Sequence, residues 1–128
     1  MAIQTINPST GKIEKTFDEF SKNKAAGIIE KAYEEFLQWK TIDFSSRKIL
    51  MKSAAGLLRE NKNKYAKILT LEMGKPIIQA VAEVEKCAWV CDYYAENAEI
   101  MLDSETVSTD ASESYIRFDP LGVVLAVF

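Results

Sequence analysis

The residues of this chain best suited to covalent chemistry are its two cysteines. Cys87 and Cys91 are four positions apart in a stretch with helical periodicity, so both thiols are expected on one face of a helix. A disulfide within one helix is unfavourable, and two thiols without histidine make a poor zinc site, so we expect free thiols. Glu83 and Glu85 lie nearby and only Lys86 is cationic, so the thiolates gain little stabilisation and no catalytic role is expected for them.

Other catalytic groups are missing from the sequence. The chain contains no histidine, which excludes a Ser-His-Asp triad, a Cys-His pair or an imidazole metal cluster within it. Its five glycines are spaced too widely for a phosphate-binding loop or a dinucleotide fingerprint. We therefore expect no catalytic residue among these 128 residues.

Helices are expected over most of the chain. Residues 5–12 combine Asn, Pro, Ser and Gly between two short apolar segments, which predicts a hairpin turn. Ser21 is placed to cap a first helix that runs to about Lys40. Its apolar residues recur at steps of four and three, so they form one stripe of an α-helix. These residues are Ala25, Ile29, Ala32, Phe36 and Trp39.

Three more helices follow in the apolar pattern. The second is expected to begin near Ser45 or Ser46, and the third to begin with Asn63 as its cap and to end at Gly74. Pro76 is well placed to open the longest helix, of about 26 residues. That helix is apolar along two edges, so it should be covered on two sides, by more protein than these residues supply.

The last part of the chain has a strand-like pattern. Residues 104–109 and 114–118 alternate polar and apolar side chains, which predicts two half-exposed antiparallel strands and a pairing surface for oligomers. Residues 121–128 form a continuous apolar run, typical of a strand buried on both faces of a parallel sheet. Since the chain offers few partner strands, we expect this run to be the first core strand of a larger protein.

Composition and charge are those of an ordinary globular protein. Hydrophobic residues make up 48% of the chain and charged residues 27%, with a formal net charge of −3. The basic side chains of the first 75 residues are interleaved with acidic ones, so solvated helix faces are favoured over a nucleic-acid site. We see neither a membrane-spanning run nor a secretory leader, and expect a cytoplasmic protein with no membrane partner.

Six short motifs occur in an order that resembles a known family. They are Asn7-Pro8-Ser9-Thr10-Gly11, Ala32-x3-Phe36-x2-Trp39, Arg47-x2-Leu50, Leu71-Glu72-Met73-Gly74-Lys75-Pro76, Tyr93-Tyr94-Ala95 and Pro120-Leu121-Gly122-Val123. Together they resemble the N-terminal quarter of the aldehyde dehydrogenase superfamily, most of all its succinate-semialdehyde dehydrogenase branch. The resemblance implies an α/β fold in which residues 1–103 are the helical part of the cofactor-binding domain. Residues 104–119 would be oligomerisation strands, and 120–128 the first strand of the cofactor domain.

The resemblance also implies a reaction, the oxidation of a small aldehyde to its acid with NAD or NADP. In that family a cysteine thiolate forms a thiohemiacetal, a glutamate activates water, and an asparagine holds the oxyanion. All three residues would lie beyond Phe128, so the chain alone is expected to be inactive and not to bind the cofactor. A homo-oligomer through the 104–119 strands is expected.

Several residues of this chain match positions with roles in relatives. Val127 and Phe128 match the end of a strand whose backbone approaches the nicotinamide half of the cofactor, although a plain core strand is an equal alternative. Lys86 lies on the helix that borders the aldehyde entrance and would attract a carboxylate-bearing substrate, although a solvated lysine is the simpler interpretation.

A cation site is implied in the same way. Glu72 matches a carboxylate that, in some relatives, binds a monovalent cation together with two backbone carbonyls, here those of Thr5 and Ile6. Oxygen ligands suit such a hard ion. The alternative is a solvated glutamate near a helix end.

A different class of function also fits the sequence. The chain would then be a non-catalytic helical module for interaction or oligomerisation, or the remnant of a gene. Cooperative melting of a discrete oligomer would favour the module, whereas an aggregating or molten chain would favour part of an enzyme.

Overall fold

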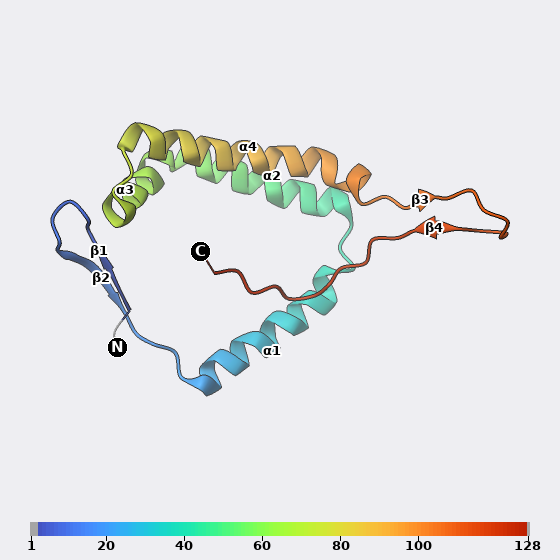
Figure 1. The fold of residues 1–128 in the computed structure, drawn as a ribbon, viewed down its shortest axis with the longest axis horizontal. Coiled ribbons are helices and arrows are strands. Elements are labelled where there is room, and N and C mark those ends of the chain that lie inside the picture. The colour runs from blue at the N-terminus through green and yellow to red at the C-terminus, as the bar shows by residue number, and fades with distance from the viewer. Residues whose placement is uncertain (1–2, 128) are drawn as a thin grey trace.

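The computed structural model describes residues 3–127, and four helices dominate them (Figure 1). In chain order the elements are β1 (Ile3–Ile6), β2 (Ile13–Phe17), α1 (Lys22–Trp39), α2 (Phe44–Glu60), α3 (Lys62–Met73), α4 (Ile77–Met101), β3 (Glu105–Thr106) and β4 (Tyr115–Ile116). Strands β1 and β2 form one antiparallel pair, and β3 and β4 form another. The predicted mostly helical segment with an N-terminal hairpin and a later strand pair is confirmed.

Capping residues set the helix boundaries. The Ser21 hydroxyl accepts a hydrogen bond from the Lys24 backbone N–H at 3.2 Å, as the sequence predicts for the start of α1. Gly74 ends α3 with a left-handed φ of 70°, which also agrees with the prediction.

Two predicted helix starts are wrong by one or two residues. Helix α2 begins at Phe44, because Asp43 is the cap and its carboxylate accepts from the Ser46 N–H at 2.8 Å. Helix α3 begins at Lys62 rather than after Asn63, following Asn61, whose side chain makes no capping bond. In both cases the chain turns earlier than the predicted cap, so Ser45, Ser46 and Asn63 lie inside their helices.

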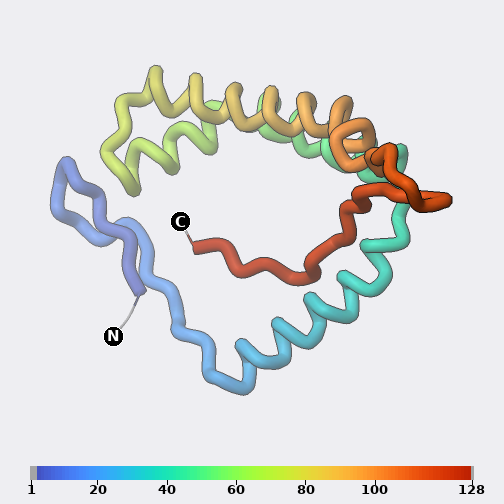
Figure 2. The backbone as a smooth tube through the Cα atoms, turned by 45° about the vertical axis from the view of Figure 1, so that its right-hand side comes forward, coloured from blue at the N-terminus to red at the C-terminus, as the bar shows by residue number. Residues whose placement is uncertain are grey.

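The packed centre of the chain lies where α4 meets α2 and α3 (Figures 1 and 2). Its buried side chains are small: Ala55, Ala66, Ala80, Ala88 and Val84. Small side chains let helix backbones approach closely, but they bury little apolar area. Among the described residues no large side chain is fully buried.

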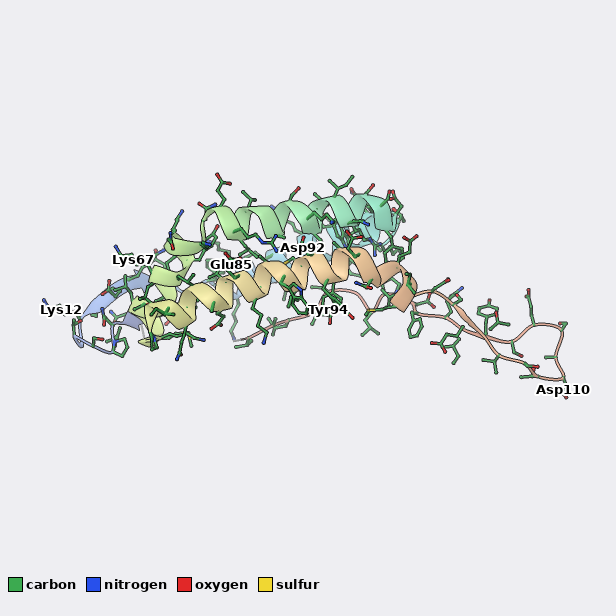
Figure 3. All side chains as sticks on the ribbon, turned by 90° about the horizontal axis from the view of Figure 1, so that it is seen from above. Lys12, Lys67, Glu85, Asp92, Tyr94 and Asp110 are labelled. Carbon is green, nitrogen blue, oxygen red and sulfur yellow. The ribbon has the colours of Figure 1, made fainter. Side chains whose placement is uncertain are left out.

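Ion pairs join the end of α2 and the start of α3 to α4 along their exposed edges. The Arg59 guanidinium donates to the Asp92 carboxylate at 2.6 Å, and Lys62 Nζ lies 2.7 Å from Glu85 Oε1. Glu85 and Asp92 both lie on the α2 side of α4 (Figure 3). The Lys62 hydrogen bond is the main reason that the pKa of Glu85 is lowered. Charge pairs therefore supplement the small apolar contact that α4 makes with α2 and α3.

The N-terminal hairpin is closed by a buried asparagine. Asn7 is 8% exposed, accepts from the Ser9 N–H at 2.9 Å and donates to Glu14 Oε1 at 3.0 Å. Gly11 completes the turn with a φ of 69°. The pairing of β1 with β2 shifts register between Thr5 and Ile6, which is a local irregularity in the ladder.

The β3–β4 pair forms an arm that extends away from the helices, with Asp110 at its tip (Figures 1 and 3). Only two residue pairs form the ladder, Glu105 with Ile116 and Thr106 with Tyr115. The strands are therefore shorter than the predicted ranges 104–109 and 114–118.

The segment after β4 runs back beside α1 (Figures 1 and 2). Residues 117–127 have no regular secondary structure, and the exposed fractions of Leu121, Leu125 and Val127 are 98%, 88% and 84%. The predicted buried strand over 120–128 is thus not formed within the described residues, because no strand lies beside it to complete a ladder. Phe128 lies outside the described residues.

Candidate functional site

A groove along α4 brings together the residues that the sequence singled out for chemistry. It has a volume of about 760 Å³ and is lined by Lys75, Gln79, Ala82, Glu83, Lys86, Cys87, Val90 and Cys91. Helical geometry explains this set, because residues four apart lie one above the other on one helix face. Two such rows, 79-83-87-91 and 82-86-90, form the lining contributed by α4.

The cysteines are free thiols within this groove. Cys87 is exposed and Cys91 is half-buried. Both predictions made for them from the sequence, free thiols and a shared helix face, are confirmed.

The groove also carries two lysines in different states. Lys75 forms an ion pair with Glu83, which neutralises both charges. Lys86 is exposed and makes no ion pair with any residue from 3 to 127. An uncompensated ammonium group next to an apolar wall can attract an anionic small molecule.

The residues proposed for a cation site lie on two elements that touch. Strand β1 carries Thr5 and Ile6 and contacts α3, which carries Glu72. The hydroxyls of Thr5 and Thr70 are buried without a hydrogen-bond partner in the described part of the chain. Buried oxygen atoms without a hydrogen-bond partner are unusual, and they fit a site that holds a hard cation or a water molecule.

Two observations limit that interpretation. Glu72 is exposed, and residues 3–127 contain no cluster of three or more His, Cys, Asp or Glu side chains arranged for a metal. Any cation would therefore depend on carbonyl and hydroxyl oxygens besides the one carboxylate. The sequence pattern did not predict Thr70, since a threonine inside a helix gives no signal of its own.

The cofactor residues proposed from the sequence are only partly described. Val127 is 84% exposed at the end of the extended segment after β4. Phe128, its predicted companion, falls outside the described residues.

A second hollow, of about 270 Å³, lies between the start of α2 and the end of α4. Arg47 contributes to its wall and donates hydrogen bonds to the carbonyls of Trp39 at 3.0 Å and Lys40 at 3.3 Å. Its guanidinium also lies over the rings of Trp39 and Phe44, at 5.6 Å and 5.3 Å from their centroids. These contacts connect α1 to α2, so we assign Arg47 a structural role.

No helix in the described part of the chain combines the length and apolar character needed to cross a bilayer.

Comparison with known proteins places these features in a family. The sequence profile of the aldehyde dehydrogenase family matches residues 1–128. A probable succinate-semialdehyde dehydrogenase [NADP(+)] of Synechocystis sp. is 46% identical over 127 residues, which cover 99% of this chain and 28% of the relative. A succinate-semialdehyde dehydrogenase [NADP(+)] of Mycobacterium avium is 43% identical, with the same coverage. The chain thus spans about 28% of the length of these curated relatives.

Solved structures agree with the sequence comparison. The succinic semialdehyde dehydrogenase of Streptococcus pyogenes, in complex with NADP+ as the cofactor, superimposes with a TM-score of 0.82 at 36% identity. The match covers 88% of this chain and 25% of that one. The protein Gox0499 superimposes with a TM-score of 0.90 at 29% identity, over 94% of this chain and 27% of its own. The helices, the hairpin and the strand pair therefore have the arrangement of this fold, and the chain belongs to the aldehyde dehydrogenase family.

Proposed function

We propose that this chain is part of an NAD(P)-dependent aldehyde dehydrogenase that oxidises succinate semialdehyde to the carboxylic acid. One observation carries the proposal, the 46% identity to the probable succinate-semialdehyde dehydrogenase [NADP(+)] of Synechocystis sp. over 99% of this chain. NADP is the favoured cofactor, because the names of the similar enzymes specify it. Residues 1–103 would belong to the cofactor-binding domain, 104–119 to the oligomerisation strands and 120–128 to the first cofactor-domain strand.

The proposed reaction needs groups that this chain does not supply. A cysteine thiolate would add to the aldehyde, the cofactor would accept the hydride, and a glutamate-activated water would release the acid. Neither Cys87 nor Cys91 is assigned the nucleophilic role, since the sequence has no histidine and the second lysine of the groove, Lys75, is already paired with Glu83. The 128-residue chain is therefore expected to be inactive on its own.

The contribution proposed for this chain is to attract the substrate. Succinate semialdehyde carries a carboxylate at the end opposite the aldehyde, and Lys86 presents an exposed ammonium group in the α4 groove. Lys75 is less available, because Glu83 already neutralises it. Lys86 would favour a carboxylate-bearing aldehyde over a neutral aldehyde of the same length.

The test is an assay of the full-length gene product. Succinate semialdehyde and butanal, which lacks the carboxylate, are compared with NAD+ and with NADP+. Lys86→Gln should raise the KM for succinate semialdehyde by up to about fivefold and leave that for butanal unchanged, because an exposed charge pair contributes at most about 1 kcal/mol. Lys67→Gln, on α3 and outside the groove, is the matched control. Absence of activity on succinate semialdehyde would refute the proposed substrate.

The cofactor is expected to need the rest of the enzyme. Val127 lies in a segment that has no partner strand among the described residues, so the cofactor contact proposed for Val127 is not preorganised. Calorimetric titration of the 128-residue chain with NADP+ should give no saturable heat. A stoichiometric isotherm would contradict this expectation.

A monovalent cation at Glu72 and the carbonyls of Thr5 and Ile6 is a further part of the proposal. The contact between β1 and α3 and the unpartnered Thr5 hydroxyl support it. Sodium or potassium chloride should then raise the unfolding midpoint more than choline chloride at equal ionic strength. Glu72→Gln should remove that difference, and an equal response to all three salts would argue against the ion.

We also propose that residues 104–119 join copies of the protein into a homo-oligomer. Their strands have exposed edges, and Tyr115 and Ile116 are 54% and 49% exposed. Light scattering of the full-length protein should show an oligomer that Ile116→Asp weakens. For the 128-residue chain, a discrete, cooperatively melting oligomer would favour the alternative function, a non-catalytic interaction module.

A further inference from the structure

The two thiols of the α4 groove are arranged as a pair. Cys87 and Cys91 both line the groove, one exposed and the other half-buried. Residues four apart on a helix have Cβ atoms about 5–6 Å apart. The helix runs without interruption from Ile77 to Met101, so this spacing is held by backbone hydrogen bonds on both sides of the pair.

That spacing suits a bridged pair of thiols better than a disulfide. A disulfide needs Cβ atoms about 3.5–4.5 Å apart, which would require the helix to unwind. A trivalent atom of pyramidal geometry that is bonded to both sulfurs at roughly 2.3 Å holds them about 3.5 Å apart. Side-chain rotation can bring the two sulfurs to that distance while the helix stays intact.

The groove around the pair can also hold an organic group. Ala82 and Val90 provide an apolar wall, and the volume of about 760 Å³ exceeds that of one aromatic ring. Among the described residues, no third metal-binding side chain joins the two cysteines to form a metal cluster. The groove therefore favours a ligand that needs only two sulfur atoms.

We propose that Cys87 and Cys91 form a two-thiol site for one thiophilic atom, of the class represented by trivalent arsenic in organic arsenicals. Thiolates prefer soft atoms of this kind. With phenylarsine oxide, both S–H bonds and the arsenic–oxygen bond break and two arsenic–sulfur bonds form. The two protons leave with the oxygen as water. Arsenic stays trivalent and neither sulfur is oxidised, so no further reagent is needed.

The test uses phenylarsine oxide and the 128-residue chain, whose helix content is first established by circular dichroism. We expect one adduct per chain by mass spectrometry, with loss of both thiols that react with Ellman's reagent. The adduct should survive excess 2-mercaptoethanol and be removed by 2,3-dimercaptopropanol, because only a second dithiol can replace two bonds at once. Cys87→Ser and Cys91→Ser should each bind at least tenfold more weakly and lose the adduct to the monothiol.

A matched variant tests the spacing itself. Cys91→Ser combined with Gln79→Cys keeps two thiols in the same groove but places them eight residues apart, about 12 Å along the helix. It should behave like a single-cysteine variant, with helix content checked by circular dichroism. Equal, monothiol-resistant binding by this variant would overturn the proposal.

Two further measurements need no variant. In concentrated guanidinium chloride the helix no longer fixes the thiols, so the affinity for phenylarsine oxide should fall. Equal affinity of the folded and denatured chains would overturn the claim that the helix forms the site. A wild-type adduct that joins two chains, detected by its mass, would do the same.

Discussion

The Cγ atom of Pro8 lies 2.8 Å from the position that a Cβ atom would occupy on Gly74. The turn of the N-terminal hairpin thus packs directly on the C-terminal end of α3. Gly74 meets two demands at once, because its φ of 70° is left-handed and its missing side chain leaves room for the proline ring. This contact also holds β1 against α3, where the cation site is proposed.

Gly74→Ala is expected to destabilise the chain. The left-handed backbone costs a non-glycine residue about 1–2 kcal/mol, and displacement of Pro8 adds to that. Gly56→Ala is the control, since a Cβ atom there meets nothing within 4 Å, and it should stabilise α2 by roughly 0.5–1 kcal/mol. Urea unfolding followed by circular dichroism measures both. Equal stability of the Gly74 variant and the wild type would show that the hairpin does not rest on α3.

The acid stability of the α2–α4 contact is expected to depend on Glu96. Its pKa is lowered to about 2, first because Lys48 donates to its carboxylate and second because Lys52 does. A carboxyl whose folded pKa lies below its ordinary value of 4.5 stabilises the fold above pH 4.5, and loses that effect as the pH falls toward 2. The unfolding midpoint of Glu96→Gln should therefore depend less on pH between pH 4.5 and 2 than that of the wild type.

The control for Glu96 is Glu99→Gln on the same helix, which leaves the Lys48 and Lys52 pairs intact. The unfolding midpoint of Glu99→Gln should change with pH as steeply as that of the wild type between pH 4.5 and 2. Because the Glu96 pairs are solvent-exposed, added salt should reduce the difference between wild type and Glu96→Gln. An unchanged slope in Glu96→Gln would refute the assignment.

Asp43 gives a second acid-dependent contribution, at the start of α2. Hydrogen bonds from the Ser45 hydroxyl and then from the N–H and hydroxyl of Ser46 lower the pKa of Asp43 to about 2 from 3.8. This contribution is complete above pH 3.8 and is lost as the pH falls toward 2. Asp43→Asn keeps an acceptor for the Ser46 N–H, so it should lower stability at neutral pH less than Asp43→Ala.

Thermal unfolding of these variants at pH 7 and at pH 2 checks this order. At pH 2 the difference between wild type and Asp43→Asn should become small, because the Asp43 carboxyl is then about half protonated in the folded chain and almost fully protonated in the unfolded chain. A wild-type advantage that persists undiminished at pH 2 would mean that the charge of Asp43 does not contribute.

The helices could be predicted from the sequence because their signals are local. Ser21 precedes a periodic apolar stripe and Gly74 follows one, and both mark helix ends as expected. The start of α2 was harder, because Asp43 stands just before the two predicted positions, Ser45 and Ser46, and only the hydrogen bonds of the folded chain identify Asp43 as the cap. The Asp43 carboxylate accepts hydrogen bonds from Ser45 and Ser46, so the two serines are donors to the capping residue and are not caps themselves.

The apolar run after Pro120 and the site residues depend on partners that are distant in sequence. Strand propensity alone does not make residues 121–127 a strand, since a ladder needs a neighbour to accept its hydrogen bonds. The groove residues, in contrast, share one helix, so the common face of Cys87 and Cys91 followed from their spacing. Thr70 gave no signal, because a threonine within a helix does not reveal from the sequence that its hydroxyl is buried without a partner in the described residues.

Close approach of the helices is expected to depend on their buried alanines. Ala80, Val84 and Ala88 form a stripe at steps of four along α4, which packs against α2 and α3. Ala88 is 0% exposed, so a leucine there must push the helices apart, at a cost of about 1–3 kcal/mol.

Ala82→Leu places the same side chain on the exposed face of α4, where it should change the free energy of unfolding by well under about 1 kcal/mol. Urea unfolding of Ala88→Leu and Ala82→Leu compares the two positions within one helix, so that differences in helix propensity cancel. If both variants unfold at the wild-type midpoint, the packing of α4 does not depend on small side chains. Loss of stability in Ala88→Leu alone would show that alanine at this position sets the distance between the helices.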